Sequence, residues 1–304
     1  MNRWRDFYKY LKKHYVLYLL LAVPILYYVI FCYIPMGGLL MAFQDYNVRD
    51  GLLGSEWVGL EVFKKVLSSQ KFWRAFGNTL KLNILGIVMG FPAPIILALF
   101  LNEIGSGKFK KAIQTILYLP HFLSWVIIGG MAILFFATHE GMVNVVLATL
   151  GFEKIPFLTN PDIWVWTYIA IGIWQSIGWG AIVYLSAITG IDQEQYDAAK
   201  VDGCNRFKMM YLITIPNIIP TIVIMLILNV GGMASISLDK PLMLGNSMVR
   251  SVSEVISTYS YTMGIEQGNF SRATAIGLFQ SVINFILLVS TNKISNKLSG
   301  ESLW

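Results

Sequence analysis

Six long apolar stretches constrain this 304-residue sequence more than any other feature. An α-helix needs roughly 20 apolar residues to cross the hydrocarbon core of a bilayer, and each stretch has about that length. They run from Val16 to Met41, Leu80 to Leu101, Ile113 to Ala137, Ile163 to Ile188, Pro216 to Ala234 and Ala273 to Thr291. The sequence therefore predicts an all-α membrane protein, with six transmembrane helices over residues 16–291.

Composition excludes a soluble globular protein. Hydrophobic residues make up 56% of the chain and charged residues only 13%, with a mean hydropathy of +0.60. Soluble domains carry about 25% charged residues, because most of their surface faces water. The first apolar stretch continues past Pro24 and Pro35 without a small-residue cleavage site, so we expect a retained span and not a signal peptide.

The distribution of basic residues predicts the orientation. If the N-terminus is cytoplasmic, more than half of the 23 Lys and Arg residues lie in inner segments, as is typical of membrane proteins. The net charge of +6 is interpreted this way and not as a sign of nucleic-acid binding. We expect a membrane protein with both termini cytoplasmic. Residues 1–15 interleave basic and aromatic side chains, which suits an amphipathic helix on the membrane surface or a plain positive flank, and residues 292–304 form a tail.

The predicted spans contain no charged residue away from their edges. Ion-coupled carriers usually need such groups, so their absence lowers the expectation of a carrier. The GSGK at Gly105–Lys108 lacks the first Gly and the Ser or Thr of a phosphate-binding loop, and the three His residues lack zinc-ligand spacing. We therefore expect no catalytic residue, no metal and no cofactor in this chain, which we predict is not an enzyme.

Residues 190–215, between the fourth and fifth predicted spans, are too many for a plain turn. Asp192 and Gln195 have the spacing of a helix-capping box. Gly203 predicts a break between two short helices, the second beginning at Asn205 and ending at Pro216. Small residues would let another surface approach closely: Ala198, Ala199 and Gly203. The pattern suits a rigid docking element, although a folded-back loop without a partner fits it too.

This segment resembles the EAA loop of permease subunits of type I ABC importers, in which Glu-Ala-Ala is followed by Gly and then I-x-L-P. The matching residues are Asp197-Ala198-Ala199, Asp202-Gly203 and Ile213-Thr214-Ile215-Pro216. The chain departs from the pattern with Asp at 197, Cys204 where Ala is usual and Ile at 215. In the family this loop fits a cleft on the ATPase. The resemblance therefore implies ATPase coupling by Asp197, Ala198, Ala199, Asp202 and Gly203.

Four further segments are similar to carbohydrate-uptake permeases, in the branch that handles oligosaccharides and polysaccharide fragments in Gram-positive bacteria. They are Pro35–Asn47, Ser55–Leu67, Tyr118–Ile128 and Met263–Phe285. This resemblance implies half of a translocation pathway, in a heterodimer with a second, homologous permease. It also implies two copies of a cytoplasmic ATPase that uses ATP and Mg²⁺, and an extracellular solute-binding lipoprotein that delivers the oligosaccharide.

A sugar passing through a helix bundle needs polar groups and aromatic faces. The candidates in the fourth and fifth spans and just beyond are Trp174, Gln175, Ser176, Trp179, Asn229 and Ser235. Interhelical hydrogen bonds and interfacial Trp belts explain the same residues equally simply. The glycine pairs Gly129-Gly130 and Gly231-Gly232 favour close helix packing.

Three alternatives stay open at this point. One is an ABC permease for a non-sugar solute, against which the long first outer loop and the extent of the resemblance argue. Another is an ion-coupled carrier, disfavoured by the uncharged spans. The third is a membrane enzyme such as a glycosyltransferase, for which no acidic metal-binding cluster stands on a cytoplasmic loop.

The predicted topology can be tested by cysteine labelling. A cysteine introduced at Ser295 should be labelled only from the cytoplasmic side and one at Asn160 only from outside, because an odd number of predicted spans separates them. A membrane-impermeant maleimide applied to intact cells and to inverted vesicles measures both. Labelling of both positions from outside cells would contradict the topology.

Overall fold

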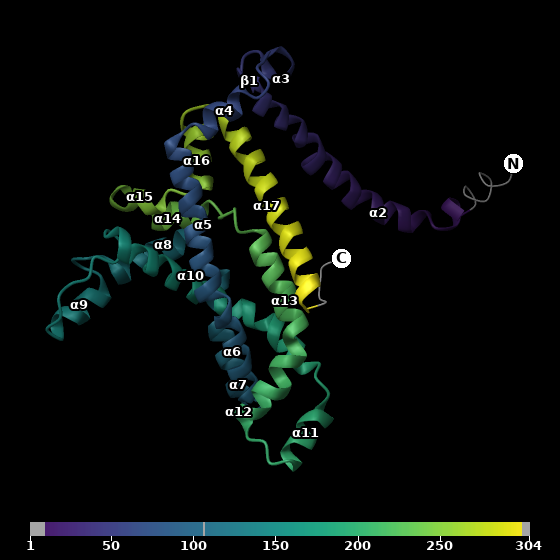
Figure 1. Ribbon diagram of the computed structural model, residues 1–304, viewed down its shortest axis with the longest axis vertical. Helices are drawn as coiled ribbons and strands as arrows, with labels where there is room; N and C mark the ends of the chain where they lie inside the picture. The colour runs from purple at the N-terminus through teal and green to yellow at the C-terminus, as the bar shows by residue number, and fades with distance from the viewer. Residues whose placement is uncertain (1–9, 106, 300–304) are drawn as a thin grey trace. The chain divides into compact units, whose positions relative to one another are not determined.

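The computed structural model describes residues 10–105 and 107–299, with side chains up to residue 297, and helices account for most of it (Figure 1). The chain forms two compact units. One contains the residues up to 66 together with 263–278, and the other contains residues 67–262 together with those from 279 onward. The candidate site lies in the second, larger unit.

The first unit begins with a continuous apolar helical run, Tyr15–Phe43, which confirms the first predicted span. The run consists of α2 (Tyr15–Tyr28), the π-helical η1 (Val29–Tyr33) and the 3₁₀-helical η2 (Ile34–Phe43). Of the segment 1–15, residues 10–13 are helical and residues 1–9 lie outside the described residues, so the expected surface helix is not described as a whole.

A small hairpin follows in the same unit. Strand β1 (Gln44–Asp45) pairs antiparallel with β2 (Glu56–Trp57), with α3 (Gly51–Gly54) between them. Helix α4 (Glu61–Leu67) buries Val62 and Val66. The segment between the first and second predicted spans is therefore folded, with an apolar helical face on α4.

Four more predicted spans are confirmed as long apolar helices. Helices α5 (Gln70–Gly90) and α6 (Pro92–Glu103) together form one of them. The others are α10 (Pro161–Thr189), the run that ends with α13 (Ile215–Gly231), and α17 (Phe270–Ser299). Helix α17 extends past the predicted end of the sixth span, so residues 292–299 are helical, while residues 300–304 lie outside the described residues.

The predicted third span, Ile113–Ala137, is not one continuous helix. Helix α7 (Lys108–Tyr118) and the 3₁₀-helical η3 (Leu119–Phe122) meet α8 (Trp125–Phe136) at a bend of 103°. Pro120 lacks a backbone donor, and Ser124 begins a new helix by accepting a hydrogen bond from the Ile127 N–H at 3.4 Å. Within the described chain, five helices are long and apolar enough to cross a membrane, and this bent pair is a sixth if it crosses as one unit.

The expected stop at Pro216 is also wrong. Helix α12 (Arg206–Met209), the π-helical η4 (Met210–Thr214) and α13 form one continuous run, Arg206–Gly231. Pro216 lies in the first turn of α13, where a missing backbone N–H is tolerated. The helix therefore leads from the predicted coupling loop directly into the fifth span.

Helix α10 is central to the larger unit, where it packs against α5, α6, α7 and α13. Its Trp164 is buried and donates a hydrogen bond from Nε1 to the Leu244 carbonyl at 2.8 Å. Leu244 ends α14 (Asp239–Leu244), a short helix that packs against α8 where Gly129 leaves room for Met243. Gly231 likewise faces Leu288, whereas Gly130 and Gly232 approach no other element, so the glycine-pair prediction holds at one residue of each pair.

The segment between the fifth and sixth predicted spans is folded through η5 (Ser247–Val249), α15 (Arg250–Ser253), α16 (Ile256–Tyr261) and η6 (Thr262–Glu266). The buried Glu254 carboxylate pairs with Arg250 at 2.9 Å and with Arg74 of α5 at 2.7 Å. Each guanidinium remains largely solvated, so the pairs satisfy the buried carboxylate without burying two further charges. Helix α9 (Met142–Thr149) has eight residues and is too short to cross, as its sequence predicts.

The contact of α10 with α7 depends on Gly178. A Cβ built on Gly178 would overlap the backbone carbonyl of Leu117, which cannot move without shifting α7. We expect Gly178→Ala to lower the free energy of unfolding of the larger unit by about 1–3 kcal/mol, the usual cost of overpacking. Thermal unfolding of the detergent-purified chain measures this effect.

Gly130→Ala is the matched control, because a Cβ at Gly130 meets no atom within 4 Å. Equal melting temperatures for the two variants would contradict the packing role of Gly178.

Candidate functional site

A cavity of about 410 Å³ lies beside α10, bounded by residues of α5, α6, α8, α10, α13 and α14. Cavities of this size are typical of small-ligand sites. Four of the six residues expected on the sugar path line it: Gln175, Ser176, Trp179 and Asn229. Asn83, Trp125, Tyr184 and Lys240 add further polar or aromatic groups to the wall. The structure thus brings most of the predicted path residues to one place.

Trp179 presents an aromatic face at this cavity. Its ring stacks on His121 with a centroid distance of 4.6 Å and an interplanar angle of 3°, and the residue is 47% exposed. His121 belongs to η3, at the bend of the third span, and its carbonyl accepts a hydrogen bond from Gln175 at 3.4 Å. The indole ring also meets Phe122 edge to face with a centroid distance of 5.9 Å, and its exposed part can contact the apolar face of a sugar ring.

Two polar side chains at the cavity retain acceptor capacity. Ser176 donates its hydroxyl hydrogen to the Gly172 carbonyl at 2.8 Å, and Asn229 donates to the Met225 carbonyl at 2.7 Å. Each bond is made within its own helix and uses donors only. Because hydroxyl and amide oxygens have lone pairs to spare, both residues can accept hydrogen bonds from substrate hydroxyls.

Ser235 lies outside the cavity wall. Its hydroxyl is hydrogen-bonded to Asn284 and, at 3.1 Å, to Gln280, both in α17. Asn83 donates to the carbonyls of Ser235 at 3.0 Å and Met233 at 2.7 Å. These bonds fix the chain where it leaves α13. Ser235 therefore has a structural contact and does not line the cavity.

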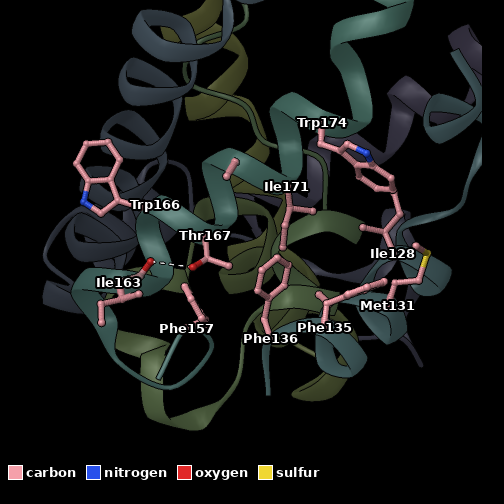
Figure 2. Close-up of a pocket in the computed structure, with 12 residues that line it drawn as sticks. Ile128, Met131, Phe135, Phe136, Phe157, Ile163, Trp166, Thr167, Ile171 and Trp174 are labelled. Atoms are coloured by element: carbon pink, nitrogen blue, oxygen red, sulfur yellow. Dashed lines mark hydrogen bonds between the residues drawn. The ribbon is translucent and has the colours of Figure 1, made fainter. Parts of the chain in front are cut away.

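Trp174 lines a different pocket, of about 650 Å³, between α8 and α10 (Figure 2). Ile171 and Phe136 also face this pocket, and Thr167 donates its hydroxyl hydrogen to the Ile163 carbonyl at 3.1 Å, shown dashed in Figure 2. The wall is almost wholly apolar and so offers little to hold a polyhydroxylated ligand. Trp174 therefore lies on a different face of α10 from the other three candidates on that helix, Gln175, Ser176 and Trp179.

Lys240 is a cavity residue that the sequence reasoning did not single out. It lies in α14, outside the candidate spans, and its Nζ is 3.7 Å from the ring centroid of Tyr168 and 5.4 Å from that of Trp125. Burial lowers the pKa of Lys240 to about 7. In sequence it is one basic residue of an outer loop, and only the packing of α14 against α8 brings it to the cavity.

The predicted coupling segment begins with α11 (Gln193–Val201). The Asp192 carboxylate accepts a hydrogen bond from the Glu194 N–H at 3.0 Å, which confirms the helix cap. Gln195 does not complete a capping box; its Oε1 accepts a hydrogen bond from Asn217 of α13 at 3.0 Å. The side chain thus ties α11 to the fifth span.

Gly203 has a φ of +75° directly after α11, which confirms the predicted break. Asp197, Ala198, Asp202 and Gly203 are exposed, whereas Ala199 is buried within the chain. Lys200 donates a hydrogen bond to Asp197 at 2.9 Å, and this bond holds the pKa of the Asp197 carboxyl below its usual value. The exposed members form a small surface on one short, well-ordered element.

Two further side-chain contacts connect this element with the spans. Tyr196 of α11 and Thr214 share a hydrogen bond of 2.9 Å, and Arg206 lies 3.7 Å from Glu103 at the end of α6. Figure 1 shows α11 and α12 together at the end of α13, beside α6 and α7. Val201, at the end of α11, is 88% exposed.

Among the described residues, no group of three His, Cys, Asp or Glu side chains is placed to hold a metal ion. The candidate features for binding and docking are the polar cavity and the exposed loop that follows α10.

Comparison with known proteins places both features in a family context. Residues 90–300 match the family described as "Binding-protein-dependent transport system inner membrane component". Protein LplB of Bacillus subtilis (strain 168) is 42% identical over 294 residues, which cover 97% of this chain and 92% of that protein. The polygalacturonan/rhamnogalacturonan transport system permease protein YteP of the same strain is 40% identical over 288 residues. The match covers 95% of this chain and 90% of that protein.

Solved structures agree with the sequence comparisons. A chain in the crystal structure of a bacterial ABC transporter involved in the import of the acidic polysaccharide alginate has a TM-score of 0.88 and 36% identity. The match covers 97% of this chain and 99% of that one. A chain of the bacterial alginate ABC transporter in complex with an alginate pentasaccharide-bound periplasmic protein has a TM-score of 0.89 and 36% identity. This match covers both chains in full. This chain therefore belongs to the family of inner membrane components of binding-protein-dependent transport systems, and its fold is that of a type I ABC importer permease.

Proposed function

We propose that this chain is a permease subunit of an ATP-driven, binding-protein-dependent importer of oligosaccharides or polysaccharide fragments. The observation that carries the proposal is the cavity beside α10, where the Trp179 face lies with hydroxyl and amide groups that have acceptors to spare. The names of YteP and of the alginate transporter, which refer to polysaccharides, support the same substrate class.

The partners follow from the same proposal. This chain supplies half of the translocation pathway, and a second, homologous permease supplies the other half. Two copies of a cytoplasmic ATPase use ATP and Mg²⁺, and an extracellular lipid-anchored binding protein delivers the oligosaccharide. The alginate transporter in complex with its periplasmic protein is a precedent for such delivery.

The orientation in the membrane places the exposed loop toward the ATPase. Both termini are cytoplasmic in a bacterial plasma membrane, which requires the bent pair α7–α8 to cross as one span. The loop of residues 190–215 then lies on the cytoplasmic side, together with the N-terminal amphipathic segment. The distribution of basic residues agrees with this placement, because more than half of the 23 Lys and Arg residues lie in segments that it puts on the cytoplasmic side.

Coupling runs through α11 and α12. Asp197, Ala198, Asp202 and Gly203 contact the ATPase, and Ala199 supports them from inside the element. Closure of the ATPase moves α11, and the contacts of Tyr196 with Thr214 and of Gln195 with Asn217 transmit the movement to the run that contains Asn229. The cavity and the loop are thereby mechanically connected.

The first test concerns the cavity. Trp179→Ala should lower oligosaccharide uptake at least several-fold, because the sugar loses its aromatic face. Trp174→Ala is the matched control, since Trp174 lines the apolar pocket, and it should leave uptake unchanged. Uptake of labelled oligosaccharides by cells that express the complete transporter is the measurement. The reverse pattern would place the path elsewhere, and uptake of an amino acid or osmolyte in place of sugars would favour the non-sugar permease.

The second test concerns the loop. Gly203→Arg should leave the amount of protein in the membrane near normal, because the loop lies outside the spans, but should strongly reduce both uptake and co-purification of the ATPase. Arg is strained at the positive φ and adds a long charged side chain to the docking surface.

Gly203→Asn is the control, because Asn tolerates the left-handed conformation and a Cβ there meets no atom within 4 Å. If Gly203→Arg matches the parent in both measurements, the loop does not couple the permease to the ATPase.

A further inference from the structure

We propose that Lys240 binds a carboxylate of the transported sugar, so that the cavity selects acidic, uronate-containing oligosaccharides over neutral ones. The inference rests on the proposed function and adds the substrate class and the residue that reads it.

The first observation is the charge of the cavity. Of the described residues that line it, Lys240 alone has a charged side chain, and the other polar groups are neutral amides and hydroxyls such as Asn83, Gln175 and Ser176. With no acidic residue in that lining, the protonated form of Lys240 gives the cavity a positive potential, which attracts anions and repels cations. A neutral sugar has no group that pairs with this charge, whereas the carboxylate of an acidic sugar is a counter-ion for the Lys240 ammonium.

The second observation is that the amine lacks an anionic partner. Among the described residues, Lys240 forms no ion pair, and its Nζ faces the rings of Tyr168 and Trp125. Aromatic faces compensate a buried ammonium only in part, and burial disfavours its charged form. The lowered pKa of Lys240 reflects this uncompensated burial. A carboxylate arriving within about 4 Å would favour the charged form and complete the site.

The third observation is the arrangement along α10. Gly172 lies directly against the Lys240 Nζ, and a Cβ at that position would overlap the amine. Ser176 follows one turn later on the same helix face, and Trp179 a further turn on. One turn is about 5.4 Å, close to the length of a sugar ring. A ring stacked on Trp179 and hydrogen-bonded to Ser176 therefore extends toward the ammonium group.

A purely structural role for Lys240 makes a different prediction. If the amine served only to hold α14 against α10, its removal would destabilise the protein. If the amine instead serves to bind an anion, Lys240→Met replaces a buried, unpaired charge by an apolar side chain of similar length. The melting temperature should then stay unchanged or rise. Thermal unfolding of Lys240→Met thus separates a positioning contact from a binding group.

The binding experiment uses the full-length chain, purified with the permease with which it assembles and reconstituted in lipid nanodiscs without binding protein or ATPase. The probes are trigalacturonate and an alginate trisaccharide, each compared with its methyl ester, which is neutral but keeps the ring stereochemistry. The parent should bind at least one acid more tightly than its ester. Lys240→Met should weaken binding of that acid by about tenfold or more, the effect of removing a charge-assisted hydrogen bond, and leave the ester unchanged. Lys240→Arg should retain the preference for the acid.

A second variant moves the amine without removing it. Gly172→Ala should also weaken binding of the acid, because the new methyl group displaces Nζ. Gly86→Ala is its control in the same cavity wall, since a Cβ there makes only an ordinary contact, 3.9 Å from Ile169.

The outcomes are distinguishable when the same probes are tested for uptake by cells with the complete transporter. If the parent takes up the neutral esters as well as the acids, or if Lys240→Met keeps the preference for acid or lowers the melting temperature, the role of Lys240 is overturned while oligosaccharide import stands. If the parent takes up neither acidic nor neutral oligosaccharides, the proposed function fails and the role of Lys240 fails with it.

Discussion

The requirement that every backbone polar group be satisfied inside the bilayer governs this structure. Helices meet it by themselves, and irregular backbone is tolerated at membrane depth only where protein or a water-filled cavity surrounds it. The break between η3 and α8 is such a place, because the Ser124 hydroxyl supplies one cap and Gln175 of α10 bonds to the His121 carbonyl. The departure from a straight span is thus stabilised by the same helix that lines the cavity, and it brings the His121 ring to Trp179.

Helix α10 serves two environments at once. One face carries Ile171 and Trp174 into the apolar pocket, and another carries Gln175, Ser176 and Trp179 to the polar cavity. Glycines on the same helix let backbone and side chains of other elements approach: Leu117 at Gly178 and the Lys240 amine at Gly172. The sequence of α10 therefore encodes packing, recognition and close approach through residues only a few positions apart.

Much of the fold could be predicted from sequence because its causes are local. Apolar length predicts the long helices, and the Asp192 cap and Gly203 predict the short element in the coupling loop. The bend in the third span was not predicted, because Pro120 and Ser124 weaken a helix without indicating how sharply it bends. Lys240 was missed for a different reason. Its place depends on α14 packing against α8 at Gly129, a contact between residues more than a hundred positions apart.

The continuous run Arg206–Gly231 has a geometric consequence. Twenty-six helical residues extend about 39 Å, so a tilt of about 10° at one end displaces the other by about 7 Å. Thr214 and Asn217, which contact α11, lie eight and eleven residues after Arg206, and Asn229 lies two residues before the end of the run, at the cavity. If α11 moves as proposed, the run acts as a lever arm, and the π-helical turn at Met210–Thr214 and the internal Pro220 are its points of least stiffness. How far Asn229 travels for a given push depends on which of the two acts as the fulcrum.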